Sequence, residues 1–383
     1  MNARIPLAAT RLLVGLLFIF SGLVKANDPA GLGYKMQEFF EVWGWHGLDG
    51  LALPLSIAMI AFEIVAGAAV LLGWRFPLFA WLLLALIVFF TFLTGYAVLS
   101  GKVRECGCFG DCIPLTAEQS FTKDLALLAL ILFLFVKRHT VAPILADRPS
   151  LAALGLTTVL SLALQFHVLR HLPIVDCLPY RKGNDLLEQM KRPPGSLPDS
   201  IEIRFVYLRD GREVEFDADH FPADFNDSAY AFVRRYDKIV RKGNAVPPIR
   251  DFVIIAPSGT DTTQAILQQP GRKILLFSRN LPADPADWSW SSGLQAIAAR
   301  ASALSIPIVW VSSDAERLQT GLAGLGWKDL PVMKGDGVAI KTAARTDPTL
   351  YLLDGASVLG KWSFADFDEA RDAIVGDTPG LPD

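Results

Sequence analysis

Charged residues are scarce in the first half of this 383-residue chain, although they make up 20% of the whole. The full chain is 52% hydrophobic, which excludes an ordinary soluble protein. The charge is concentrated in the second half, which from about Ser196 has the composition of a soluble domain of ordinary size. The sequence therefore predicts a membrane part up to about Leu172, followed by a soluble part.

Long basic runs and clustered histidines are also absent from the sequence. The net charge is −3, so the electrostatic footprint of a nucleic-acid-binding protein is missing. The five histidines are scattered, and neither they nor any Ser or Asp pattern indicates a hydrolase. The expected partners are therefore a lipid bilayer and other proteins, and no nucleic acid.

Five segments are long and apolar enough, or nearly so, to cross a bilayer, which takes roughly 20 mostly apolar residues. They are residues 6–24, 51–72, 76–99, 121–136 and 151–169. The fourth is the shortest, but Thr116 and Gln119 have the form of a capping box and extend the helix at its start. Five such segments in succession predict an α-helical membrane bundle over residues 1–172.

The short loops between these segments carry unequal numbers of Lys and Arg, which sets the orientation. With the N-terminus inside, the inner side holds Arg4, Arg75, Lys137, Arg138 and Arg148, and the outer side holds Lys35, Lys102 and Arg104. This bias predicts an inner (plasma) membrane protein whose soluble part is periplasmic, that is, extracytoplasmic. A cleaved signal peptide is the competing interpretation of residues 6–24, and the charged Arg11 within the apolar run argues against it.

Three of the four cysteines lie between the third and fourth apolar segments, and the last follows the fifth segment. The loop reads Cys-Gly-Cys-Phe-Gly-Asp-Cys from Cys106 to Cys112, and Cys177 stands in the stretch Asp-Cys-Leu-Pro-Tyr. Two membrane crossings separate the loop from Cys177, so all four thiols are expected in one compartment. In the predicted orientation that compartment is the oxidising one, where disulfides persist.

Thiol exchange, structural disulfides and a metal site are the three interpretations of this cysteine set. A Cys-x-Cys pair closes only into a strained ring, and strained, exposed disulfides are the labile ones. Structural disulfides would instead pin the outer loop to the start of the soluble part. Four sulfurs also suit a tetrahedral metal site, but no His flanks the cluster within the loop and the spacing is not that of a common zinc ribbon. We therefore expect exchange and no metal.

The charges beside the cysteines suggest their roles in exchange. Lys102 and Arg104 precede Cys106 and favour its thiolate, so Cys106 is the expected nucleophile. Cys108 is the expected near partner of Cys106, and Cys177 the resolving sulfur. Cys112 follows Asp111, which disfavours its thiolate, and is expected to be dispensable.

Two charged residues inside the apolar segments are further candidates, because charges within a membrane are costly and usually functional. Arg11 lies about one and a half turns into the first segment, and Glu63 lies about 18 Å along the second from the opposite face. Their depths match in a core of about 30 Å. We therefore expect an Arg11–Glu63 ion pair with a structural or proton-relay role.

The first outer loop, residues 25–50, mixes aromatic and charged residues. Such a stretch is expected to lie in the membrane interface as an amphipathic helix, with its aromatic side chains as a belt. It is also a candidate roof over the cysteine loop.

The motifs of the first half resemble those of the DoxX/MauE superfamily of small bacterial membrane proteins. The resemblance rests on Arg-Leu-Leu-Val-Gly from Arg11, Ser-Gly-Leu-Val-Lys from Ser21, Glu63 with Gly67, and Cys-Gly-Cys-Phe-Gly-Asp from Cys106. The chain is more similar to the MauE-like branch with a fifth helix, a Cys-Leu-Pro-Tyr stretch and a C-terminal domain. Cys112 is an addition to the usual motif.

The resemblance implies a thiol–disulfide redox or maturation factor for extracytoplasmic client proteins, as in methylamine utilisation. The DoxX side of the superfamily implies a quinone as the candidate cofactor. The competing interpretation is a non-enzymatic membrane assembly or binding protein, with structural disulfides and a docking domain. Whether the chain is an enzyme stays open at this point.

The soluble half begins after a linker, residues 173–198, that contains Cys177 and ends in breakers, Pro-Pro-Gly-Ser-Leu-Pro up to Pro198. A hairpin is expected about Asp210 and Gly211, because two strand-like runs flank this pair. A polar helix is expected over residues 228–242. Residues 199–246 are therefore predicted to form a hairpin-plus-helix segment.

Residues 247–383 alternate between short apolar runs and helical segments, which predicts an α/β domain whose strands are covered on both faces. The runs beginning at Ile249, Lys273 and Asp347 resemble thioredoxin-like domains of the TlpA/peroxiredoxin type. The resemblance implies a cis bond before Pro348 and a Cys-x-x-Cys pair after the second run. Residues 281–290, at that place, hold no sulfur, so this domain is not expected to perform thioredoxin chemistry itself.

Overall fold

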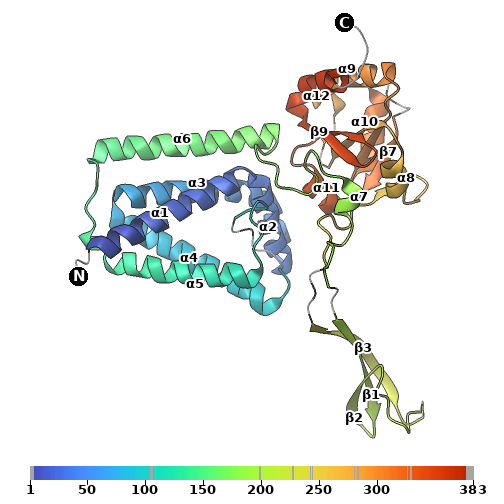
Figure 1. The fold of residues 1–383 in the computed structure, drawn as a ribbon, viewed down its shortest axis with the longest axis horizontal. Coiled ribbons are helices and arrows are strands. Elements are labelled where there is room, and N and C mark those ends of the chain that lie inside the picture. Colours follow the sequence, from blue (N-terminus) through green and yellow to red (C-terminus); the bar gives the residue numbers. More distant parts are fainter. Residues whose placement is uncertain are drawn as a thin grey trace.

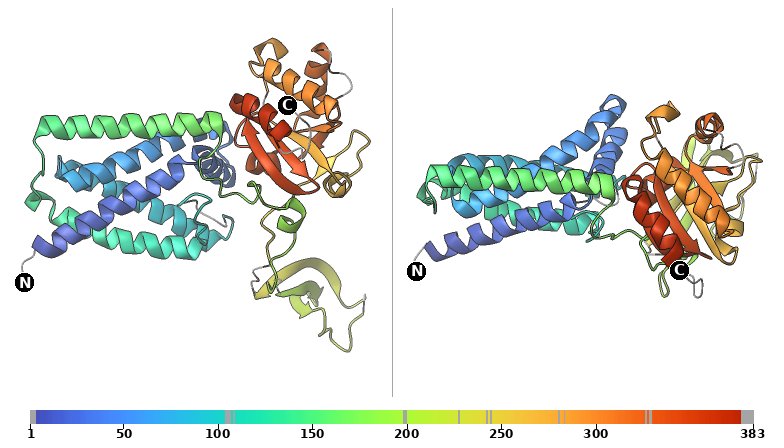
Figure 2. Two further views of the ribbon diagram at one scale, coloured as in Figure 1. Left: turned by 45° about the horizontal axis from the view of Figure 1, so that its top comes forward. Right: turned by 90° about the horizontal axis from the view of Figure 1, so that it is seen from above.

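The fold is described from a computed structural model over residues 4–103, 107, 109–197, 200–226, 228–241, 243, 245–279, 281–282, 284–325, 327 and 330–376. A bundle of long helices and an α/β domain lie end to end, and a small sheet projects from the α/β domain (Figures 1 and 2). The order of these parts along the chain is the predicted one.

The five predicted membrane segments are confirmed as helices long and apolar enough to cross a bilayer, counted over the described residues. They are α1 (Arg4–Ala26), α3 (Ala52–Leu72), α4 (Phe76–Ser100), α5 (Ala117–Val136) and α6 (Asp147–His171). The capping box is also confirmed, since Thr116 Oγ1 accepts from the Gln119 N–H at 3.2 Å and the Thr116 N–H donates to Gln119 Oε1 at 3.0 Å. Short 3₁₀ helices η1 (His46–Leu51) and η2 (Arg138–Thr140) connect neighbouring helices.

The outside of the bundle is apolar. Leu78, Phe92 and Leu156 are 51%, 60% and 60% exposed, which is costly in water and favourable in lipid. Inside the bundle, α1 and α3 approach closely along small residues. A Cβ added at Gly67 would lie 2.7 Å from the Gly15 carbonyl oxygen, so glycine at this position lets the two backbones touch.

The loop between α1 and α3 contains the expected helix, α2 (Pro29–Val42), which lies at the end of the bundle nearest the α/β domain (Figure 1). Asp28 caps it by accepting from the Gly31 N–H at 3.0 Å, and Pro29 occupies its first turn. The aromatic residues at its end, including Trp43 and Trp45, pack against one another with ring centroids 5.1 Å apart. The helix therefore separates the lipid-embedded helices from the soluble part.

The projecting sheet has the strand order β2-β1-β3, with β1 (Ser200–Arg209), β2 (Arg212–Asp217) and β3 (Ala231–Arg241). The predicted hairpin about Asp210 is confirmed, because Arg209 pairs with Arg212 across it. The predicted helix over residues 228–242 is wrong, since residues 231–241 form β3, which pairs with β1. β-branched and aromatic residues such as Val233, Tyr236 and Ile239 favour a strand there, and the interspersed charges are tolerated because every residue of β3 is exposed.

The α/β domain contains a six-stranded mixed sheet of order β4-β7-β6-β5-β8-β9. Its strands are β4 (Ile254–Ile255), β5 (Arg272–Ser278), β6 (Ile308–Ser312), β7 (Val332–Gly335), β8 (Thr349–Asp354) and β9 (Ser357–Ser363). β6 runs parallel to β5 and β7, and the other pairs are antiparallel. The Asp347–Pro348 bond is cis, as expected.

Helices cover both faces of this sheet, which confirms the α/β prediction. They are α7 (Leu186–Gln189), α8 (Thr263–Gln268), η3 (Pro285–Asp287), α9 (Ser291–Ala303), α10 (Ala315–Gly324), α11 (Gly337–Ala343), η4 (Phe364–Asp366) and α12 (Phe367–Gly376). One core lies under α7, α8 and α11, and the other under α9, α10 and α12. The central strand β5 supplies both cores, since Leu275 faces one and Ile274 and Leu276 face the other.

Candidate functional site

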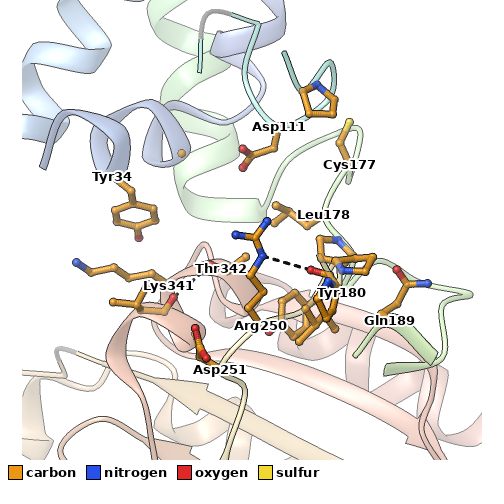
Figure 3. A pocket seen from close by; sticks show the side chains of 18 of the residues that line it. Tyr34, Asp111, Cys177, Leu178, Tyr180, Gln189, Arg250, Asp251, Lys341 and Thr342 are labelled. Atoms are coloured by element: carbon orange, nitrogen blue, oxygen red, sulfur yellow. Dashed lines mark hydrogen bonds between the residues drawn. The ribbon is translucent and has the colours of Figure 1, made fainter. Parts of the chain in front are cut away.

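A polar cleft of about 1090 Å³ lies where the bundle meets the α/β domain (Figure 3). Its walls come from α2, the loop before α5, the linker after α6, residues 246–251 and α11. Tyr34 and Asp111 stand on the bundle side of this space, across from Lys341 and Asp251 of the α/β domain (Figure 3). Cys177 also lines it, so a sulfur atom borders the cleft.

Cys177 is joined to Cys112 in a disulfide with Cα atoms 4.9 Å apart. Both residues are half-buried. The bond ties the loop between α4 and α5 to the linker that leads into the α/β domain. It confirms that Cys112 and Cys177 lie at the same end of the bundle.

The predicted exchange residues Cys106 and Cys108 lie outside the described residues, so their roles stay predictions. Gly107, which lies between them in the sequence, is one of the described residues. A Cβ added there would lie 3.1 Å from Lys35 Cγ of α2. The predicted roof therefore contacts the cysteine loop at this point. The sequence predicts a dispensable Cys112 because Asp111 disfavours its thiolate, whereas the structure makes Cys112 the partner of Cys177.

Arg345, in the chain after α11, connects the α/β domain to the bundle. Its Nε donates to Asp28 Oδ2 at 2.8 Å and its Nη2 donates to Asp111 Oδ2 at 2.7 Å. Its third nitrogen, Nη1, donates to the Lys341 carbonyl at 2.6 Å. The Arg345 side chain is only 5% exposed. Burial raises the pKa of Asp28, and the Arg345 guanidinium opposes this shift.

A second buried cation reaches the linker. Lys361 Nζ of β9 donates to Asp176 Oδ2 at 2.9 Å, and the Lys361 side chain is also 5% exposed. Burial lowers the pKa of Lys361, and the neighbouring carboxylate of Asp176 partly offsets the effect. This ion pair holds the linker against the α/β sheet immediately before Cys177.

Three cations of the α/β domain surround the ring of Tyr34 from α2. Arg279, Lys341 and Arg345 lie 5.3, 5.5 and 5.3 Å from its centroid. Lys341 Nζ also donates to Gln37 Oε1 at 3.1 Å. Burial raises the pKa of Tyr34, although Arg279 and Arg345 act in the other direction. The docking surface of α2 is thus polar and aromatic and does not resemble a hydrophobic core.

Inside the bundle, Glu63 has a different partner from the one expected. Its two carboxylate oxygens accept from Lys25 Nζ at 2.5 and 2.6 Å, and Ser21 Oγ donates to it at 3.4 Å. Arg11 Nη1 instead lies beside Gly73, where it would be 3.4 Å from an added Cβ. Gly73 follows Glu63 by ten residues, which is about 15 Å along the axis of α3. The expected Arg11–Glu63 pair is therefore wrong.

The error has a physical cause. Depth was counted from the ends of the apolar runs, whereas the alignment of α1 with α3 is fixed by side-chain packing. Gly22 faces Ile64, which brings Glu63 to the level of Ser21 and Lys25, one turn apart on α1. Lys25 ends the motif that begins at Ser21, but the apolar run stops at Val24, so hydropathy places Lys25 in the following loop, whereas α1 continues to Ala26.

Neither of the usual signs of a metal site, clustered carboxylates or clustered His and Cys side chains, is found in the described part of the chain. Among the described residues, no three His, Cys, Asp or Glu side chains are grouped so as to hold a metal ion. A smaller, apolar cavity of about 240 Å³ lies between α2, α3 and α4, lined by side chains such as Phe39, Trp43 and Phe90. Lys35 borders both this cavity and the polar cleft.

Comparison with known proteins agrees with the architecture of the first half. Residues 3–137, which contain α1 to α5, match the family model of the methylamine utilisation protein MauE. The N-terminal region is thus a MauE-family region. The MauE match ends immediately after α5, and α6 with the whole α/β domain lies beyond it.

Two further comparisons match parts of the chain. Residues 201–242 match the model of a domain of unknown function (DUF8463), and these residues form the projecting sheet. Protein TlpB of Flavobacterium psychrophilum is 28% identical over 128 residues, which are 33% of this chain and 35% of that protein. The match therefore spans about a third of the relative's length. No solved structure matches the chain.

Proposed function

We propose that this protein is a membrane-embedded thiol–disulfide exchange factor for the maturation of extracytoplasmic proteins. The observation that carries the proposal is the half-buried Cys112–Cys177 disulfide at the edge of the polar cleft. Exposed disulfides are the more labile ones, and the cleft gives a client thiolate access to the Cys177 side of this bond. The MauE family of the N-terminal region supports the same role.

The proposed exchange balances without any further reactant. A client dithiol reduces a Cys106–Cys108 disulfide and becomes a disulfide itself. The Cys106 thiolate then attacks the sulfur of Cys177, the bond to Cys112 breaks, and Cys112 leaves as a thiolate. Cys108 next attacks Cys106 and releases Cys177. One client disulfide has formed, and the Cys112–Cys177 bond has been reduced to two thiols.

The α/β domain is proposed to hold the client, as a thioredoxin-like scaffold without its own sulfur chemistry. All four cysteines of the chain lie before residue 178, so this domain has none. It nevertheless forms one wall of the cleft, through α11 and residues 246–251. We infer that a client polypeptide is bound between this wall and the disulfide.

Thiol trapping in living cells tests the exchange. We expect the Cys112–Cys177 pair of the parent protein to be a mixture of oxidised and reduced forms in mass-shift assays. Cys106→Ser and Cys177→Ser should abolish client oxidation, because each removes a sulfur from the relay. Cys108→Ser should accumulate an internal Cys106–Cys177 disulfide, since Cys108 is the thiol that resolves this bond in the proposed relay.

The competing function predicts a different pattern. The disulfide and the buried ion pairs of Arg345 and Lys361 fasten the α/β domain to the bundle, as a rigid docking module would require. A fully oxidised, reductant-resistant Cys112–Cys177 pair, together with client oxidation unchanged by all four Ser replacements, would establish the assembly protein and reject the exchange factor.

A further inference from the structure

Each cysteine of the disulfide directly follows an aspartate in the sequence. Asp111 precedes Cys112, and Asp176 precedes Cys177. Each aspartate accepts a hydrogen bond from a buried cation of the α/β domain. The cations come from separate elements, Arg345 from the chain after α11 and Lys361 from β9, so two parts of the domain each reach a residue that precedes a cysteine of the disulfide.

We propose that the α/β domain tunes the disulfide electrostatically: Arg345 and Lys361 are positioning residues that neutralise the two aspartates and make the Cys112–Cys177 bond a stronger oxidant. The domain then regulates a redox centre to which it contributes no sulfur. The inference deepens the exchange function proposed above and rests on it for its biological use. The electrostatic effect itself is independent of any client.

The chemistry follows from the charges of the reduced state. Reduction breaks the S–S bond and adds two electrons, which come from two thiols that become a disulfide. It leaves thiols at Cys112 and Cys177, each next to an aspartate. A carboxylate disfavours a neighbouring thiolate, and a cation paired with that carboxylate removes the effect. Lower thiol pKa values stabilise the reduced form, and a stabilised reduced form makes the disulfide more oxidising.

The burial of the cations argues against a role in docking alone. Both side chains are 5% exposed, and taking a charge out of water is costly enough that apolar contacts often stabilise an interface better. Lys341 shows how this domain makes an ordinary docking contact, a hydrogen bond to Gln37 on the polar face of α2. Arg345 and Lys361 instead meet the carboxylates of the residues that directly precede the two cysteines in the sequence.

The experiment measures the equilibrium of the full-length protein with glutathione, in detergent, by mass-shift trapping. In a Cys106→Ser/Cys108→Ser background, Cys112 and Cys177 are the single pair of cysteines that exchanges with glutathione. Arg345→Gln and Lys361→Gln should each shift the equilibrium about tenfold toward the disulfide, which is about 30 mV for this two-electron couple. Lys341→Gln is the matched control, because it removes a docking contact to Gln37 that involves neither aspartate, and should change the equilibrium less than twofold.

Substitutions of the two aspartates distinguish electrostatic tuning from docking, because the two roles predict different directions for the shift of the glutathione equilibrium. Asp111→Asn and Asp176→Asn remove the carboxylates and should shift the equilibrium toward the thiols, again about tenfold. The double variant Arg345→Gln/Asp111→Asn should return close to the parent. If the residues only held the domain in place, all these variants would shift the equilibrium in one direction, which would overturn the proposal. The isosteric Asn variants preserve the test should Arg345→Gln fail to fold.

This experiment also separates the two proposals. Client oxidation that is unaffected by Cys112→Ser would reject the exchange function, while opposite shifts in glutathione equilibria would still establish the tuning. Equilibria unchanged in every variant, combined with client oxidation that requires Cys112, would reject the tuning alone.

Discussion

At the scale of single residues, two opposite charges are buried together inside the bundle. Lys25 and Glu63 are 3% and 2% exposed and form an ion pair to which Ser21 adds a hydrogen bond. Neither charge is tolerable alone at that depth, because an uncompensated buried ion keeps its full desolvation cost. The pair therefore fixes the level at which α1 meets α3.

Removing one member of this pair should be much more damaging than removing both. Glu63→Gln leaves Lys25 charged and buried, and should lower the free energy of unfolding by about 3–5 kcal/mol. Lys25→Met combined with Glu63→Gln should recover much of the loss. Denaturation of the purified protein in mixed detergent micelles measures both. Arg11→Gln is the control, and the expected result is that its effect adds to that of Glu63→Gln without coupling.

At the scale of elements, hydropathy was sufficient to predict the long helices, but not how they pack. The bounds of α1, α3, α4, α5 and α6 differ little from the apolar runs, since the runs themselves decide what lies in lipid. The pairing of Glu63 was out of reach because it depends on glycine contacts between two helices. β3 was missed for a related reason, since the charges of an exposed strand hide its alternation.

The close approach of α1 and α3 gives a sharp test of this packing. Ala normally stabilises a helix relative to Gly by about 1 kcal/mol. At Gly67 the added methyl would lie 2.7 Å from the Gly15 carbonyl oxygen and 3.0 Å from the Ile19 nitrogen, so Gly67→Ala should instead destabilise by about 1–3 kcal/mol. Gly155→Ala in α6 is the matched control, because nothing lies within 4 Å of its Cβ. Equal effects in detergent unfolding would contradict the contact.

At the scale of the whole molecule, the α/β domain is held to one end of the bundle by contacts from two sides. Arg345 and Lys341 reach α2, while Ser363 Oγ donates to the Arg170 carbonyl at the end of α6 at 2.6 Å. Of the site, sequence alone could predict the cysteines, which are rare and clustered. It could not predict Arg345, which is 234 residues from Asp111 and carries no local signal.

The side of the membrane on which this end lies stays a prediction, and reporter fusions test it. The loop between α5 and α6 contains Lys137, Arg138 and Arg148, which favour the cytoplasmic side. Alkaline phosphatase fused after the last residue should therefore be active, because the enzyme needs an oxidising compartment for its own disulfides. The same reporter fused after Thr140 is the control and should be inactive, whereas a fluorescent protein there should be bright. The reversed pattern would place the α/β domain in the cytoplasm, where a reducing thiol pool would work against the Cys112–Cys177 bond and the proposed direction of exchange.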